Sequence, residues 1–232
     1  MTSYWLLTAV VYVGCLVAPL ALVLLIRLWY LTPGLSGRKT PALVLRENTC
    51  RVGVLLGSGG HTSEMLALLE SMDATRYSPR IYLVTQGDTL SEERTRVWEG
   101  QRGQQDGDHA RIMLRFVICQ LPRARNVGQS FLTAPWSVLQ TAYSAAGILW
   151  HYRPDLIVCN GPGTCVPVCV IALIYRALWL CPTRTLYVES FARTSTLSLT
   201  GRILYPLVDN FVVQWPELQK RYPRALYRGV LV

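Results

Sequence analysis

The chain has 232 residues and a formal net charge of +9 at pH 7, which allows one sizeable domain or two small ones. Nearly all of the positive charge is arginine, because Lys39 and Lys220 are the only lysines. Arginine suits phosphate groups, anionic lipid surfaces or nucleic acid, although a compositional bias toward arginine explains the charge equally well. The seven scattered cysteines exclude a zinc site with the usual spacing, and we expect them to be reduced core thiols of a cytosolic domain that holds neither metal nor cofactor.

Residues 1–30 are predicted to form a transmembrane anchor. No charged side chain occurs in Met1–Ile26, which is long enough to span a bilayer of about 30 Å at about 1.5 Å per residue. A cleaved signal peptide would have a basic start and a shorter apolar core. Residues 31–50, rich in proline and glycine, are predicted to be a linker. The basic residues after the apolar run place the following domain in the cytosol: Arg27, Arg38, Lys39 and Arg46.

A glycine loop follows the first predicted strand. The apolar run Val52–Leu56 ends at Gly57–His61, and from Met65 onward apolar residues recur at helical spacing. This order of strand, glycine turn and helix directs backbone N–H groups at an anion. Thr62 or Ser63 is expected to cap the helix.

The loop does not match three common functional motifs. A dinucleotide-binding fingerprint requires glycine where Thr62 stands, and a P-loop requires a lysine. A nucleophile elbow requires glycine two residues before Ser58, where Leu56 stands. A tight turn without function is the structural alternative. His61 favours a functional site, because a neutral imidazole at the mouth of the turn can accept a proton.

Further apolar runs predict strands that alternate with helices. The other predicted strands are Arg80–Gln86, Met113–Cys119, Asp155–Cys159, Thr185–Val188 and Asp209–Val213. The later helices are predicted at Phe131–Tyr152, Cys165–Leu180 and Leu197–Leu204. Residues 87–110 are polar and are predicted to form a long surface loop with one helical turn. The alternation predicts one α/β domain over residues 51–232, with a mostly parallel sheet and ligand loops at its C-terminal edge.

Three loops at that edge form the predicted site. They are Gly57–His61, Asn160–Thr164 and Glu189–Arg193. Two glycine turns with arginines nearby suit a diphosphate better than a neutral sugar. Arg123 and Arg125, at the end of the third strand, either meet a phosphate or belong to a solvated turn, and the sequence favours neither.

Five motifs in this order resemble one family. They are Gly-Ser-Gly-Gly-His-Thr, Pro-Arg-Ala-Arg-Asn-Val-Gly-Gln-Ser, Cys-Asn-Gly-Pro-Gly-Thr-Cys-Val-Pro, Tyr-Val-Glu-Ser and Val-Gln-Trp-Pro. The family is the membrane-anchoring subunit of a two-chain transferase, which adds the second GlcNAc to dolichyl-diphosphate-GlcNAc on the cytosolic face of the endoplasmic reticulum in asparagine-linked glycosylation. The resemblance runs from Arg51 to the C-terminus. The glycine loop is also similar to that of the bacterial transferase that acts on undecaprenyl lipid I, in which one chain carries both halves of a GT-B fold.

The resemblance implies that this chain is the Rossmann-like, acceptor-side half of a GT-B glycosyltransferase and is inactive alone. A soluble chain that binds UDP-GlcNAc is the implied partner, and the GlcNAc-phosphate transferase of the first step is a further one. His61 is the implied base for the acceptor hydroxyl, and Glu189 would hold the acceptor sugar or orient His61. The other implied contacts with the acceptor are Gly57, Ser58, Gly59, Gly60, Asn160, Gly161, Gly163, Thr164, Arg123 and Arg125. The expected location is the endoplasmic reticulum membrane, as a single-pass protein, with the nuclear envelope as a second site.

Two alternatives compete with an acceptor site. A pure scaffold would recruit the catalytic chain without contributing chemistry, but it has no need of His61. A nucleotide-binding oxidoreductase is disfavoured because the third glycine of its fingerprint is absent from this sequence. A nucleic-acid binder is disfavoured because few exposed aromatic residues are expected.

For each of two apolar regions, the sequence allows two kinds of surroundings. The end of the chain, Val230, Leu231 and Val232, is predicted to dock the partner, with a last strand of the chain's own sheet as the alternative. The helices Phe131–Tyr152 and Cys165–Leu180 either border the membrane or form core, and core is slightly favoured because helices of α/β domains are apolar on their inner side. A second span over Cys165–Leu180 is disfavoured, since proline and arginine interrupt a short run.

Overall fold

The computed structural model describes residues 2–38, 49–105, 116–125 and 134–232. In this part of the chain, parallel strands form one sheet in the order β3-β2-β1-β4-β5-β6-β7. The strands are β1 (Val52–Leu55), β2 (Arg80–Thr85), β3 (Phe116–Leu121), β4 (Leu156–Asn160), β5 (Arg184–Val188), β6 (Asn210–Val213) and β7 (Leu226–Tyr227). The helices are α1 (Thr2–Leu31), α2 (Pro33–Ser36), α3 (Gly60–Glu70), α4 (Thr89–Gln105), α6 (Ala134–Tyr152), α7 (Cys165–Ala177), α8 (Leu199–Leu204) and α9 (Pro216–Arg221).

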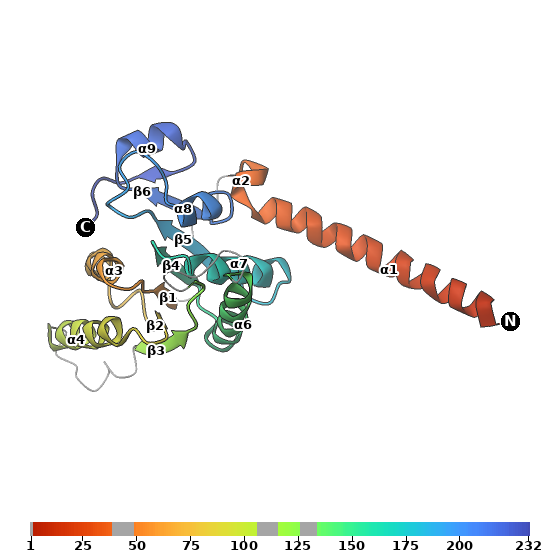
Figure 1. Cartoon of the computed structure of the whole chain (residues 1–232), viewed down its shortest axis with the longest axis horizontal. Coiled ribbons are helices and arrows are strands. Elements are labelled where there is room, and N and C mark those ends of the chain that lie inside the picture. The colour runs from red at the N-terminus through yellow and green to blue at the C-terminus, as the bar shows by residue number, and fades with distance from the viewer. Residues whose placement is uncertain (1, 39–48, 106–115, 126–133) are drawn as a thin grey trace.

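Helices cover both faces of the sheet, with α3 and α4 on one side and α6, α7 and α8 on the other (Figure 1). Side chains of β1 alternate between the two cores: Val54 packs with Met65 of α3, whereas Leu55 packs with the cluster of α6 and α7. Sheets buried on both faces consist of nearly continuous apolar strands, which is why the sequence predicted them well. The predicted parallel α/β sheet is confirmed.

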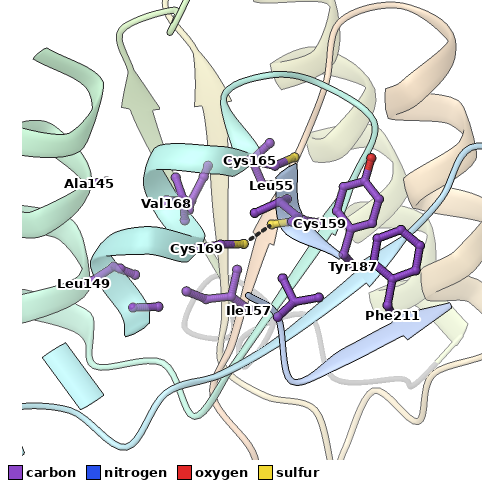
Figure 2. Close-up of a cluster of buried hydrophobic side chains, with 14 of the residues drawn as sticks. Leu55, Ala145, Leu149, Ile157, Cys159, Cys165, Val168, Cys169, Tyr187 and Phe211 are labelled. Atoms are coloured by element: carbon purple, nitrogen blue, oxygen red, sulfur yellow. Dashed lines mark hydrogen bonds between the residues drawn. The ribbon is translucent and has the colours of Figure 1, made fainter. Parts of the chain in front are cut away.

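Figure 2 shows the core under α6 and α7, where buried cysteines meet. The Sγ atoms of Cys159 and Cys169 are 3.7 Å apart, much farther than the roughly 2 Å of a disulfide. Burial raises the pKa of the neighbouring Cys165 thiol, so it stays protonated and unreactive. All seven cysteines are free, as predicted, but Cys15 on α1 is exposed rather than part of a core.

The helix α1 projects away from the domain (Figure 1) and is fixed to it at its C-terminal end. Arg27 Nη2 donates to the Arg176 carbonyl, and Arg176 Nη2 donates to the Leu31 carbonyl, both at 3.0 Å. Among the described residues, no helix is long and apolar enough to cross a membrane. The transmembrane span predicted over residues 1–30 is therefore not found in that part of the chain.

The predicted linker at residues 31–50 begins with ordered structure. The short helix α2 docks on the domain through the Gly34 N–H, which donates to the Pro206 carbonyl at 2.9 Å. A Cβ on Gly34 would overlap Pro206, so glycine permits this close approach. The linker prediction for residues 39–48 lies outside the described residues.

The surface loop predicted at residues 87–110 is wrong, because α4 occupies most of it; positions 106–110 lie outside the described residues. The buried face of α4 is polar, with Ser91, Thr95 and Glu99 spaced four residues apart. Glu99 accepts hydrogen bonds from Arg80 Nε and Nη2 at 2.6 and 2.7 Å and from Tyr82 Oη at 2.6 Å. An ion pair with another element holds this helix, so apolar periodicity could not predict it.

The helix α6 has two different faces. Its inner face buries Thr141, Ala145 and Leu149. Its outer face, called the α6 face below, exposes Trp136, Leu139, Tyr143 and Trp150. The interpretation of this helix as core is therefore wrong at Trp136 and Leu139.

The remaining predicted elements form with small changes at their ends. The predicted starts of the third strand at residues 113–115 and of α6 at residues 131–133 lie outside the described residues. Much of α7 is buried, as predicted, and its Pro167 lies in the first turn, where no helical N–H is lost. The helix α9 and the strand β7 follow β6, in a region where the sequence predicted neither a helix nor a strand.

Candidate functional site

The loops after β1 and β4 meet at the C-terminal edge of the sheet. These strands are neighbours, and the chain runs from them toward opposite edges. Ligands of open α/β sheets bind in the crevice that such a reversal creates. Here His61 Nδ1 lies 3.1 Å from Asn160 Oδ1, so the structure joins two of the three predicted loops directly.

Two glycines of these loops make room for His61. Gly161 has a φ of +78°, and a Cβ there would overlap the His61 ring. A Cβ on Gly57 would lie 2.6 Å from the Cβ of His61 and 3.0 Å from Pro162. The imidazole is thus held between two turns that only glycine allows.

The other three glycines of the loops face open space. Gly59 has a φ of +65° and precedes the first residue of α3, Gly60. A Cβ on Gly59, Gly60 or Gly163 would have no protein atom within 4 Å. Their backbones are therefore accessible to a ligand, as an anion that approaches a helix N-terminus requires.

The contacts of Asn160 fix the tautomer of His61. Asn160 Nδ2 donates to the Val188 carbonyl at 3.3 Å, which turns Oδ1 toward the imidazole. Since Oδ1 only accepts, His61 Nδ1 carries the proton of the neutral ring and Nε2 is left as the acceptor. The His61 side chain is 38% exposed, so Nε2 is the basic atom available to a substrate.

Glu64, on the first turns of α3, increases the basicity of His61. Its Oε2 lies 3.5 Å from His61 Nδ1. The hydrogen bond to Glu64 raises the pKa of His61 against the effect of burial, and Asn160 and the charge of Glu189 add to it. Burial opposes ionisation of Glu64, but hydrogen bonds from His61 and from the Phe191 backbone N–H lower its pKa overall. The site therefore pairs a carboxylate with an imidazole, an arrangement suited to general base catalysis.

The comparisons with known proteins decide the family. The family described as "Oligosaccharide biosynthesis protein Alg14 like" matches residues 52–231. The chain belongs to the Alg14 family. A relative from Yarrowia lipolytica is 41% identical over 212 residues, covering 90% of this chain and 93% of the relative. The human relative is 36% identical over 212 residues, covering 91% and 94%. Both are named UDP-N-acetylglucosamine transferase subunit ALG14, so the resemblance inferred from the motifs is confirmed.

A solved structure supports the fold of this Alg14-family chain. A putative UDP-N-acetylglucosamine 2-epimerase from Listeria monocytogenes superposes with a TM-score of 0.55 at 10% identity. The superposition covers 76% of this chain and 42% of that structure. At this identity the likeness concerns the Rossmann-like α/β fold alone.

Glu189 of the Alg14-family chain lies under the site rather than in it. Its Oε2 accepts from the backbone N–H and the hydroxyl of Ser198 at 3.1 and 3.2 Å, and its Oε1 accepts from the Ser190 N–H at 3.2 Å. Burial raises the pKa of Glu189 despite these bonds, and the residue is 0% exposed. The structure thus gives the orientation of His61, predicted for Glu189, to Asn160 and Glu64.

Sequence reasoning missed two residues of the site. Glu64 stands three residues after His61, and this spacing on a helix places both on one face. Gln214 is the first residue after β6 and is 1% exposed. Its Nε2 donates to the Glu189 carbonyl at 3.1 Å and lies 3.4 Å from Glu64 Oε1. A polar residue at the C-terminal end of an inner strand was the available signal.

Arg123 and Arg125 follow β3, on the same edge of the sheet as the glycine loop. The strand β2 separates β3 from β1, so about 10 Å divides the two strands. The structure does not bring these arginines to His61. Residues 126–130 of their motif lie outside the described residues.

The remaining predicted residues divide between surface and core. Ser58 is exposed and Thr164, before α7, is buried. The predicted cap at Thr62 or Ser63 is wrong, because α3 begins at Gly60 and Gly59 occupies the N-cap position. The Thr62 hydroxyl instead lies inside the helix and bonds to the Gly57 carbonyl.

The C-terminal segment does not form a strand of its own. The strand β7 ends at Tyr227, and Val230, Leu231 and Val232 are 51%, 38% and 40% exposed. The alternative of a last strand at these three residues is therefore wrong. The Leu231 N–H donates to Gln214 Oε1 at 2.9 Å.

Proposed function

We propose that this chain is the acceptor-side subunit of the transferase that adds the second GlcNAc to dolichyl-diphosphate-GlcNAc. The observation that carries the proposal is His61, which lies between two glycine loops at the switch point of the sheet with Nδ1 against Asn160 Oδ1, so that Nε2 is the proton acceptor of the neutral ring. The relatives of this chain are named as subunits of a UDP-N-acetylglucosamine transferase. A scaffold without chemistry does not require a histidine with a fixed tautomer and a carboxylate partner.

In the proposed reaction the acceptor hydroxyl attacks C1 of the GlcNAc of UDP-GlcNAc. The new O–C1 bond forms as the bond from C1 to the diphosphate oxygen breaks, and UDP leaves. His61 Nε2 takes the hydroxyl proton, and the Glu64 carboxylate stabilises the imidazolium that results. The open backbones of Gly59, Gly60 and Gly163 are suited to the acceptor diphosphate, where N–H groups and the helix N-terminus favour negative charge.

The second half of the enzyme would come from another chain. The described part of this chain contains a single Rossmann-like sheet, whereas a GT-B transferase needs two facing domains. We propose that a soluble subunit binds UDP-GlcNAc and that Val230–Val232 form part of its docking surface. The first-step GlcNAc-phosphate transferase is a further proposed partner.

Membrane association is the remaining part of the proposal. Residues 2–26 of the uncharged run lie on α1, and near the C-terminal end of this helix Arg27 contacts Trp179 of the domain. Trp29 is 53% and Trp179 is 62% exposed, and the Arg27 guanidinium lies 3.6 Å from the Trp179 ring centre. Exposed aromatic and basic side chains are typical of protein surfaces at the lipid headgroups. We propose the cytosolic face of the endoplasmic reticulum, and the nuclear envelope continuous with it, as the location.

Replacing His61 tests the function directly. His61→Ala in the membrane-bound complex should lower kcat about a hundredfold, the effect of losing a general base, while recovery of the partner and KM for UDP-GlcNAc stay unchanged. His151→Ala, an exposed histidine on α6, is the matched control and should keep full activity. Near-normal kcat for His61→Ala would favour the scaffold function instead.

The pH dependence gives a second measurement on the same residue. A general base must be neutral, so kcat should fall on acidification. Because the pKa of His61 is raised, this fall should lie above the ordinary histidine pKa of about 6.5. Glu64→Gln removes the negative charge beside His61 and should move the fall to lower pH. An acid limb that Glu64→Gln leaves in place would contradict the role of this pair.

A further inference from the structure

Gln214 joins the active-site pair to the end of the chain. It follows β6 and is 1% exposed, so both ends of its amide require partners within the protein. Its Nε2 lies 3.1 Å from the Glu189 carbonyl and 3.4 Å from Glu64 Oε1. Its Oε1 accepts from the Leu231 N–H at 2.9 Å.

These contacts form one continuous path of hydrogen bonds. From the exposed segment Val230–Val232 the path runs through the Leu231 N–H to Gln214. From Gln214 it runs to Glu64, whose other oxygen lies beside His61 Nδ1. The segment proposed to meet the partner therefore lies two side chains from His61.

An amide has one accepting and one donating end, which makes this path directional. While the Leu231 N–H occupies Gln214 Oε1, the amide N–H groups must point toward Glu64 and Glu189. If Leu231 leaves, the buried Oε1 loses its donor and the amide is free to turn. Glu64 then loses a hydrogen bond that stabilises its carboxylate.

We propose that Gln214 is a positioning residue through which the seated C-terminal segment holds the Glu64–His61 pair in its active arrangement. This inference deepens the proposed function and rests on it. It makes catalysis depend on the position of residues 230–232, the surface that the partner would hold in place. Without its partner, this chain would then lack the UDP-GlcNAc that the partner binds, and its base His61 would also be less well ordered.

The electrostatic consequence has a definite sign. The charged groups that act on His61 are Glu64 of α3 and Glu189 after β5, and Arg193 acts in turn on Glu189. Glu64 also receives hydrogen bonds from the Phe191 N–H and the Ser190 side chain. Loss of a donor to Glu64, or a new negative charge next to it, makes the Glu64–His61 pair take up a proton more readily. The acid limb of the kcat profile should therefore move to higher pH.

Gln214→Glu tests the connection to Glu64. When ionised, the new carboxylate can still accept from the Leu231 N–H but cannot donate to Glu64. In the full-length complex on membranes, with dolichyl-diphosphate-GlcNAc and UDP-GlcNAc, kcat should fall about tenfold and its acid limb should move to higher pH. KM for UDP-GlcNAc and partner recovery should not change. A wild-type kcat and acid limb would overturn the proposal.

Leu231 provides a matched pair of variants in an exposed segment, where folding is not at stake. Leu231→Pro keeps an apolar side chain but removes the N–H, whereas Leu231→Ala keeps the N–H and loses most of the side chain. Because Leu231 belongs to the proposed docking surface, both variants should weaken partner binding. At saturating partner, Leu231→Pro should have a kcat about tenfold lower than that of Leu231→Ala and an acid limb at higher pH than that of Leu231→Ala. Equal kcat and equal acid limbs for the two variants would overturn the path through Gln214.

His61→Ala distinguishes failure of the proposed function from failure of the path through Gln214. If His61→Ala keeps its activity, the proposed function fails whatever the Gln214 variants do. If His61→Ala loses activity while Gln214→Glu and Leu231→Pro behave as wild type, only the path through Gln214 fails.

Discussion

Two surfaces of the domain expose apolar side chains, and they differ in kind. The α6 face is helical and mostly aromatic, and α6 packs against α7, the helix that α1 contacts. The C-terminal segment is irregular and aliphatic, and it ends on the opposite side of the domain (Figure 1). Aromatic rings such as those of Trp and Tyr tolerate contact with both water and apolar groups, as at a lipid headgroup layer. Short aliphatic side chains gain most when a protein pocket removes them fully from water.

The surroundings of the two surfaces strengthen the difference. Next to the α6 face, the Arg153 guanidinium lies 4.7 Å from the centre of the Trp150 ring, which adds a positive charge suited to anionic lipid. The C-terminal segment is held instead by its backbone, through Leu231 and Gln214, and its side chains stay outside. We therefore propose the α6 face as the surface for the membrane and the C-terminal segment as the surface for the partner, and each can be altered alone.

The largest expected effect follows removal of Val230–Val232. These three residues are 51%, 38% and 40% exposed. Covering the exposed part of each contributes about 1 kcal/mol before ordering costs. The deletion should therefore weaken partner binding about a hundredfold, measured as partner recovery from membranes. The amount of this chain in the membrane should stay the same. Undiminished partner binding would contradict the proposed docking role of the C-terminal segment.

A tenfold effect is expected when the α6 face is charged. In the double variant Trp136→Glu and Leu139→Glu, kcat/KM for a long-chain dolichyl acceptor should fall about tenfold, because two carboxylates repel and desolvate poorly at a lipid surface. Activity on a short-chain isoprenoid analogue should be unchanged, as should partner recovery. Leu90→Glu is the control, since Leu90 is 53% exposed on α4, over the other face of the sheet. Equal losses on both acceptors would contradict a membrane-facing role.

The sequence predicted most of the fold because each central strand is an apolar run that stops at a glycine or polar turn. This pattern located the loops at Gly57 and Asn160, and the rule for parallel sheets brought them to one edge. It failed for α4, where Glu99 is held by Arg80, a partner nineteen residues earlier in another element. A buried ion pair leaves no apolar period in the sequence, so only the structure reveals the helix.

The structure brings the predicted loops to one edge of the sheet, but the sequence did not identify all the side chains that meet there. Motif comparison identified His61 and Asn160, which the structure places in contact. The resemblance implied that Glu189 holds the acceptor sugar or orients His61. A motif does not tell which way a side chain turns, and the Glu189 carboxylate turns toward Ser198. Glu64 and Gln214 could not be ranked from sequence, because their importance comes from contacts between α3 and the end of β6.

The smallest effect separates a lipid interface from any other apolar contact. Tyr143 is 85% exposed, so its substitution changes little in the fold. At a headgroup layer an aromatic ring is favoured over an aliphatic side chain of similar size, because its face is apolar and its edge is polar. Tyr143→Leu should therefore weaken use of the long-chain acceptor about threefold, corresponding to less than about 1 kcal/mol, whereas Tyr143→Trp should use this acceptor as well as the unsubstituted protein does.

A protein partner that covers the α6 face with an apolar pocket would show the reverse order, with leucine tolerated and the larger tryptophan excluded. Steady-state kinetics on liposomes of phosphatidylcholine, with and without phosphatidylserine, distinguish the two outcomes, since only a lipid interface makes the difference between the variants depend on the vesicle.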